Sequence, residues 1–143
     1  KLKLTNNRIL SGNNGVIAQL FYFINIYDDI NIVLFNRSEF YIEDKDQFKS
    51  GNNISTSLFL TKELFEKFNA ILESRYEVQG ISYQNDSEML NTGKQILSLV
   101  PQFSYNFDEL SISLFFEMPV YKKYEGVQLS EKLATGIALI YMF

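Results

Sequence analysis

The stretch Leu133-Ala-Thr-Gly-Ile-Ala-Leu-Ile-Tyr-Met-Phe143 decides the fold. In this stretch the small residues Ala134, Gly136 and Ala138 alternate with larger, mostly apolar residues. This period of two predicts a strand with one apolar face. Chain ends are usually polar and frayed, so an aromatic end indicates a strand that stops at the boundary between an apolar phase and water. The larger residues at the alternate positions are Leu133, Thr135, Ile137, Leu139, Tyr141 and Phe143.

Seven more segments precede this one and alternate in the same way. The clearest covers residues 109–120, where the even positions are all apolar and the odd ones mostly polar. Residues 96–107 and 68–80 repeat the pattern, and the first segment is the weakest, because its alternation ends after Thr5. The remaining predicted strands are 1–10, 16–27, 30–43 and 54–61.

The predicted connections alternate between short and long. Tight turns are expected at residues 27–29, 62–64 and 106–109. Longer polar stretches cover 11–15, 44–53, 82–94 and 121–132. This asymmetry is typical of outer-membrane β-barrels, whose turns on the periplasmic side are short and whose external loops are longer. By this count the C-terminus falls on the side of the short turns.

The terminal strand resembles the C-terminal signature of bacterial outer-membrane β-barrels, in which a final Phe is read by the barrel-assembly machinery. The resemblance implies an all-β fold: an antiparallel, up-and-down transmembrane β-barrel with about eight strands in one domain, residues 1–143. It also implies contact with outer-membrane lipid and lipopolysaccharide, and a periplasmic C-terminus. The predicted assembly signal comprises Leu133, Ile137, Leu139, Tyr141 and Phe143.

A second resemblance covers the last third of the chain. It rests on the run from Leu97 to Asn106 and on the pattern Glu117-Met-Pro119-Val-Tyr121 followed by Gly126-Val-Gln128-Leu129. These residues resemble the C-terminal hairpins of a transporter-like outer-membrane family associated with phenol meta-pathway channels. Members of that family are usually longer, so one alternative is that this chain is an N-terminally truncated part of a larger barrel, with other outer-membrane subunits as partners. The resemblance implies no particular substrate.

Composition excludes several classes of function. The net charge of −4 and the pI near 4.8 argue against a nucleic-acid partner. There is no Cys for disulfides or thiol chemistry and no His, the commonest general base and metal ligand. We therefore expect no enzymatic activity, no cofactor and no metal site.

Charged residues on the polar strand faces are the candidates for a functional cluster facing the lumen. Opposite charges there are expected to pair across strands, because an unpaired buried charge is costly. Glu73 and Glu77 each lie two residues from Arg75, which makes them its predicted ion-pair partners rather than an acid–base pair. The full set is Arg37, Glu39, Glu43, Glu73, Arg75, Glu77 and Glu117.

Three functions remain open on the sequence. The first is a transporter or porin-like channel for small solutes in the outer membrane. The second is a small filled barrel with a structural or complex-anchoring role, because the interior of an eight-stranded barrel holds little beyond side chains. The third is a soluble β-sandwich binding module, because alternation alone does not distinguish an inward from an outward apolar face.

Overall fold

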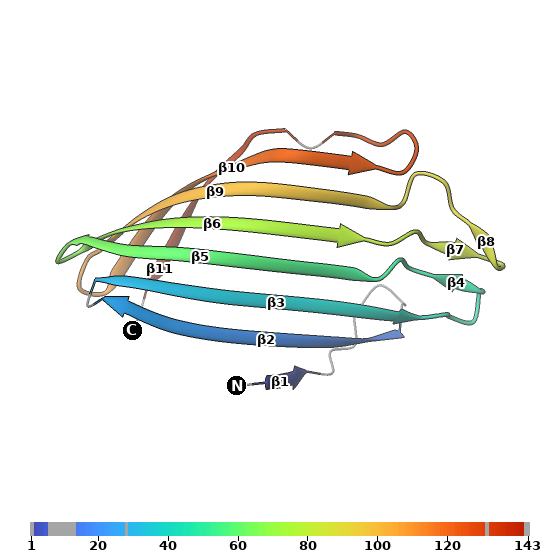
Figure 1. The fold of residues 1–143 in the computed structure, drawn as a ribbon, viewed down its shortest axis with the longest axis horizontal. Helices are drawn as coiled ribbons and strands as arrows, with labels where there is room; N and C mark the ends of the chain where they lie inside the picture. The colour runs from blue at the N-terminus through green and yellow to red at the C-terminus, as the bar shows by residue number, and fades with distance from the viewer. Residues whose placement is uncertain (1, 6–13, 28, 131, 142–143) are drawn as a thin grey trace.

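The computed structural model of the protein describes residues 2–5, 14–27, 29–130 and 132–141. Eight antiparallel strands form one large sheet, in which each strand pairs with the next long strand along the chain (Figure 1). Its order is β1-β2-β3-β5-β6-β9-β10-β11. The strands are β1 (Leu2–Thr5), β2 (Asn14–Tyr27), β3 (Ile30–Ile42), β5 (Asn53–Phe65), β6 (Phe68–Gln79), β9 (Lys94–Asn106), β10 (Leu110–Tyr124) and β11 (Ala134–Tyr141).

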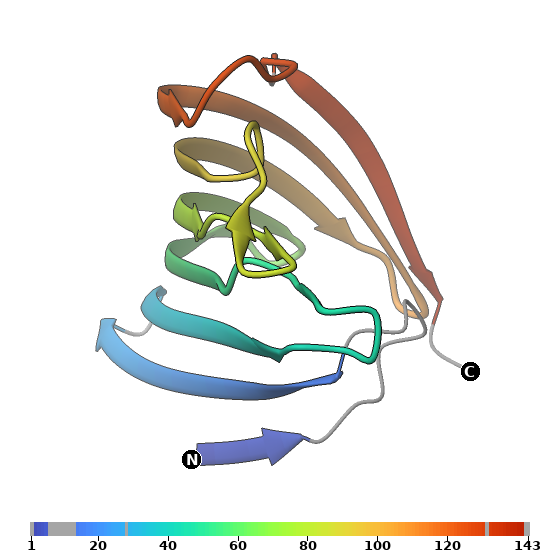
Figure 2. The same cartoon turned by 90° about the vertical axis from the view of Figure 1, so that its right-hand side faces the viewer.

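The predicted all-β, up-and-down architecture is confirmed. The sheet is bent into a deep curve, with β1 and β11 at its two ends (Figure 2). Among the described residues, no ladder joins these two strands. The predicted closed barrel therefore stays a prediction. So does the assembly signal at Phe143, which lies outside the described residues, as do residues 1 and 6–10 of the predicted first strand.

The short and long connections occur at opposite ends of the sheet, as predicted. Short turns join β2 to β3, β5 to β6 and β9 to β10, and the last residue of β11, Tyr141, pairs with the first residue of β10, Leu110, at that end. One predicted turn is misplaced: residues 62–64 belong to β5, and the chain reverses at Glu66 and Lys67. A bulge between Glu63 and Phe65 extends the ladder to Phe68.

The longer loops hold a second, three-stranded sheet that the sequence analysis did not predict. Strands β4 (Phe48–Lys49), β7 (Tyr83–Gln84) and β8 (Ser87–Glu88) lie within stretches expected to be loops. This sheet lies beyond the right-hand end of the large sheet in Figure 1. Non-glycine residues with positive φ form its turns: Gln47 at 55°, Asn85 at 51° and Asp86 at 59°. Asn and Asp are residue types that turns favour, whereas Gln is not.

The concave face of the large sheet carries its charged clusters together with the buried apolar side chains of Ile17, Ile96 and Val100, whereas the convex face is mainly apolar and exposed. On the concave face, Glu73 is 3% exposed, Ser57 3% and Ser98 1%. On the convex face, Leu72 is 46% exposed and Leu58 47%, although they neighbour those residues along the same strands. We call the outward set the convex apolar face: Val16, Leu20, Tyr22, Ile24, Ile54, Leu58, Leu60, Leu72, Tyr76, Phe103, Tyr105, Leu114, Met118, Ile137, Leu139 and Tyr141.

Candidate functional site: the concave polar face

A hydrogen-bonded cluster centred on Glu73 occupies the middle of the concave face. Arg75 Nε donates to Glu73 Oε1 at 2.8 Å, and Arg75 Nη2 donates to Glu73 Oε2 at 3.0 Å. Both oxygens of the carboxylate thus bind the guanidinium of a residue two positions along β6. Such bidentate geometry is the strong form of an arginine–carboxylate pair.

Two neutral side chains from neighbouring strands complete the bonding of Glu73. Ser57 on β5 donates its hydroxyl to Glu73 Oε1 at 2.7 Å. Gln102 on β9 donates through Nε2 to Glu73 Oε2 at 3.3 Å. A carboxylate with a side chain only 4% exposed is thereby satisfied by three partners from three adjacent strands, as a buried charge requires.

Arg75 also reaches across β9 to Glu117 on β10. Its Nη1 lies 3.5 Å from each carboxylate oxygen of Glu117. The side chains of Arg75 and Glu117 are 27% and 23% exposed, so this outer contact meets solvent whereas Glu73 does not. We call Glu73, Arg75, Glu117, Ser57 and Gln102 the Glu73 cluster.

A second, smaller cluster lies on β3. Arg37 Nε donates to Glu39 Oε1 at 2.6 Å, and the hydroxyl of Tyr41 donates to Glu39 Oε2 at 2.5 Å. All three residues follow one another at every second position, which puts them on the same face of the strand. Because Arg37 is 42% exposed, this ion pair is open to solvent on its cationic side.

The structure brings together five of the seven charged residues predicted for the lumen. Glu73, Arg75 and Glu117 form one cluster, and Arg37 and Glu39 the other. Glu77 shares the face of β6 with Arg75, near enough for its charge to act on that guanidinium. Glu43 follows the last residue of β3 and is exposed, so it takes no part in either cluster.

Sequence reasoning missed the neutral members Ser57, Gln102 and Tyr41. Only Tyr41 could have been found from the pattern of its own strand, because it follows Arg37 and Glu39 at every second position. The role of the other two becomes visible only through the register, which places Ser57 opposite Arg75 and Gln102 opposite Ile71. The residue pattern within a single strand does not specify how that strand is aligned with its neighbours.

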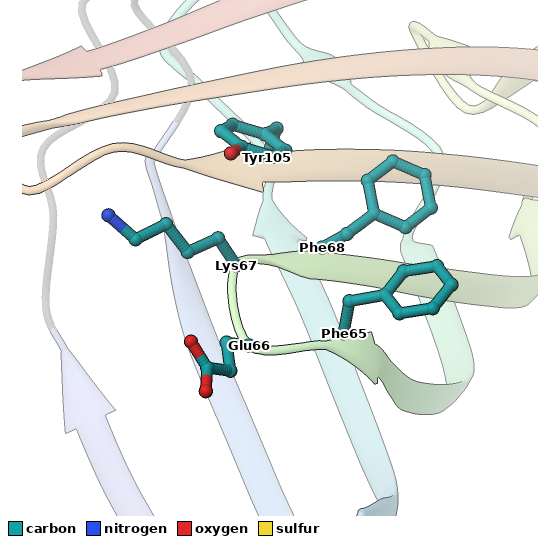
Figure 3. A pocket seen from close by; sticks show the side chains of 5 residues that line it. All are labelled: Phe65, Glu66, Lys67, Phe68 and Tyr105. Atoms are coloured by element: carbon teal, nitrogen blue, oxygen red, sulfur yellow. The ribbon is translucent and has the colours of Figure 1, made fainter.

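Aromatic rings gather on the outer surface where the short turns are. Figure 3 shows Phe65, Phe68 and Tyr105 around the β5–β6 turn, with Glu66 and Lys67 at its tip. Phe68 stacks on Phe103 with ring centroids 6.1 Å apart. Tyr105 meets Phe107 edge to face with centroids 4.7 Å apart.

Polar contacts border these rings at the ends of the strands. Lys67 Nζ donates to Asp108 Oδ1 at 2.9 Å, a hydrogen bond that raises the pKa of the lysine. Tyr141 donates its hydroxyl to Glu109 Oε2 at 2.7 Å. Apolar rings with polar groups at one edge are suited to an interface between a membrane and water.

The described residues hold neither a helix long and apolar enough to span a membrane nor a group of three acidic residues arranged to bind a metal ion. Comparison with known proteins identifies no relative: no family model, curated protein or solved structure matches this chain.

Proposed function

We propose that this chain forms the wall of an outer-membrane β-barrel that passes small polar solutes along its concave face. The observation that carries the proposal is the distribution of side chains: the convex apolar face is exposed, and the ion-paired clusters lie on the concave face. Monomeric soluble proteins rarely expose a contiguous apolar patch larger than a few hundred Å², and larger ones mark an interaction or membrane surface. Barrels in membranes alternate apolar residues outward with polar residues inward.

Strand length supports the same proposal. The strands β2, β3, β5, β6, β9 and β10 have 14, 13, 13, 12, 13 and 15 residues. A tilted strand needs about 9–11 residues to cross the hydrocarbon of a bilayer. Each of these strands is therefore long enough to span it with residues to spare.

The distance between the aromatic residues at the two ends of the convex face also fits the thickness of a membrane. Tyr76 and Tyr121 both pair with Leu97, whereas Tyr105 pairs with Phe68 at the short-turn end. The eight-residue step from Leu97 to Tyr105 corresponds to roughly 26 Å along the strand at ~3.3 Å per residue, and to about 20 Å of height at a tilt of ~40°. Apolar bands of outer-membrane barrels are about 25 Å tall between their aromatic girdles. The two rows thus have nearly the separation of such girdles.

A filled barrel with an anchoring role is the second candidate, and the Glu73 cluster favours it. Arg75 connects β6 to β10 across the intervening strand, so its side chain extends over the concave face. In a barrel closed by eight strands alone, such a cluster would fill much of the interior. A conducting channel needs a wider ring, which further strands or subunits would supply.

The β-sandwich alternative requires a second layer over the apolar face. Within the described residues, the only other sheet consists of three two-residue strands at the loop end. That sheet is too small to cover the convex apolar face. Lipid, lipopolysaccharide and the assembly machinery are the partners that the membrane proposal implies.

The test is to refold the chain into phospholipid vesicles and to measure ion conductance across planar bilayers. We expect the protein to need detergent or lipid to stay monodisperse and to give discrete conductance steps. A folded, vesicle-bound protein without conductance would favour the filled barrel. A chain that is folded and monodisperse in plain buffer would contradict both membrane functions.

A further inference from the structure

A cavity of about 440 Å³ lies at the loop end of the large sheet. Its base is formed by the ends of three adjacent strands, at Gln79, Lys94 and Tyr124. Its walls come from the loop between β6 and β9 and from the loop between β10 and β11. It is thus separate from the Glu73 cluster and opens where the external loops of the proposed barrel would be.

Hydrogen bonds fix the two wall loops to each other. Asn91 Oδ1 accepts from the backbone N of Val127 at 2.6 Å, and Gln128 Nε2 donates to the carbonyl of Gly93 at 2.7 Å. Asn91 itself has a φ of 69°, a left-handed conformation that Asn tolerates better than most residues.

The first wall loop is also fixed internally. Thr92 Oγ1 accepts from the backbone N of Ser82 at 2.9 Å and donates to the carbonyl of Met89 at 2.8 Å. These bonds and those between the loops hold the walls in place, so the cavity is preformed, as small-molecule sites usually are.

The same side chains retain hydrogen-bonding groups that no described residue uses. The Oδ1 atom of Asn91 accepts a hydrogen bond from Val127, and its Nδ2 group is left as a donor. The Nε2 group of Gln128 donates to the carbonyls of Gly93 and Glu125, and its Oε1 atom is left as an acceptor. Gln79 makes no side-chain hydrogen bond within the described part of the chain and adds a donor and an acceptor.

The remaining lining favours a neutral ligand with apolar patches. Among the described residues that line the cavity there is no carboxylate, and Lys94, the one charged residue among them, already takes part in another interaction. Val127 and Leu129, which line the cavity together with Tyr124, are 89% and 98% exposed. Amide donors and acceptors next to exposed apolar side chains match a molecule with hydroxyl edges and C–H faces.

We propose that this cavity binds a neutral saccharide. Each sugar hydroxyl both donates and accepts, which suits the Asn91 donor and the Gln128 acceptor. The sugar's C–H faces would lie on Tyr124, Val127 and Leu129. A volume of about 440 Å³ admits a ligand of one or two sugar rings. This inference does not depend on conduction through the barrel.

Saturation-transfer NMR on the full chain in an amine-oxide detergent, which carries no sugar headgroup, tests the proposal. The probes are maltose and glucose, with potassium phosphate titrated separately by calorimetry as an anion. We expect saturation transfer to the sugar ring protons. In Gln79→Ala the dissociation constant for the sugar should rise about 3- to 10-fold, as the loss of one hydrogen bond predicts. The control is Gln19→Ala, which removes an amide from β2 outside the cavity.

Leu129→Ala provides a second variant, which we expect to leave folding unchanged because that side chain is almost fully exposed. It should also weaken saccharide binding. Absence of transfer to either sugar, binding of phosphate alone, or equal losses in Gln79→Ala and Gln19→Ala would overturn the proposal. None of these results would alter the conductance measured for the proposed channel.

Discussion

Gly136 on β11 lies directly opposite Phe115 on β10, and the phenyl ring covers the glycine on the concave face. A Cβ built at Gly136 would overlap the ring atoms Cζ and Cε1 of Phe115. An aromatic ring over a cross-strand glycine is a known way to fix the register of a sheet edge. Gly136, one of the small residues of the last strand, therefore has to lack a side chain so that the ring of Phe115 can lie over it.

Gly136→Ala should therefore destabilise the protein by roughly 1–3 kcal/mol, the usual cost of overpacking. Phe115→Leu in the same chain should recover much of that loss by making room for the methyl group. Urea midpoints in detergent micelles would measure both. If the double variant were no more stable than Gly136→Ala, the ring would not be the source of the strain.

Arg75 and Glu117 should contribute unequally to stability. Replacing Arg75 with Met leaves the buried carboxylate of Glu73 without its bidentate partner, at a cost of roughly 3 kcal/mol. Glu117→Gln removes only a 3.5 Å contact to a partly exposed carboxylate and should cost under about 1 kcal/mol. Unfolding free energies from the same urea titrations would compare the two. Equal losses would contradict the central position assigned to Glu73.

The two faces of β10 should differ in their tolerance of charge. Leu114 pairs with Ile137 and Phe103 on the convex apolar face, whereas the adjacent Ser113 faces the concave side. Arg at position 114 or at 139 should cost roughly 2–4 kcal/mol if it is placed at the bilayer midplane. The fraction of protein folded into vesicles measures this, with Ser113→Arg as the matched control. Equal insertion of Leu114→Arg and Ser113→Arg would contradict the lipid-facing assignment.

The backbones of two loop segments approach closely at Gly51 and Gly80, and only Gly51 needs to be a glycine. A Cβ at Gly51 would overlap the carbonyl oxygen of Gly80, and the backbone N of Gly51 donates to Ser82 Oγ at 3.0 Å. A Cβ at Gly80 would lie 3.5 Å from its nearest neighbour, the backbone N of Asn52, which is an ordinary van der Waals contact. Gly51→Ala should thus loosen the loop sheet far more than Gly80→Ala. Hydrogen exchange at residues 48–49 and 83–88 would show this, and similar exchange in the two variants would contradict it.

Much of the fold was predictable from alternation alone. Each of the eight predicted segments overlaps a strand of the large sheet, because a period of two survives wherever one face is uniformly apolar. The pairing of Leu139 with Ile112 confirms that the apolar positions of the last strand and of residues 109–120 share a face. The order of the strands followed from the short turns that join neighbours.

The small sheet and the full Glu73 cluster were not predictable in this way. Strands of two residues carry no period, and β4 and β7 pair although the whole β5–β6 hairpin separates them in the sequence. The cluster depends on Ser57, Gln102 and Glu117, each on a different strand from Glu73. Their meeting is set by register and by curvature, which single-strand patterns do not encode.

The two edge strands of the large sheet, β1 and β11, run in opposite directions. Antiparallel pairing reverses the chain at every step, so in a row of eight strands the first and last run in opposite senses. The edge of β11 is therefore already oriented to accept β1 as one more antiparallel neighbour. Any even number of added strands preserves this relation and any odd number breaks it. If the proposed ring is larger than eight and wholly antiparallel, it must grow by whole hairpins.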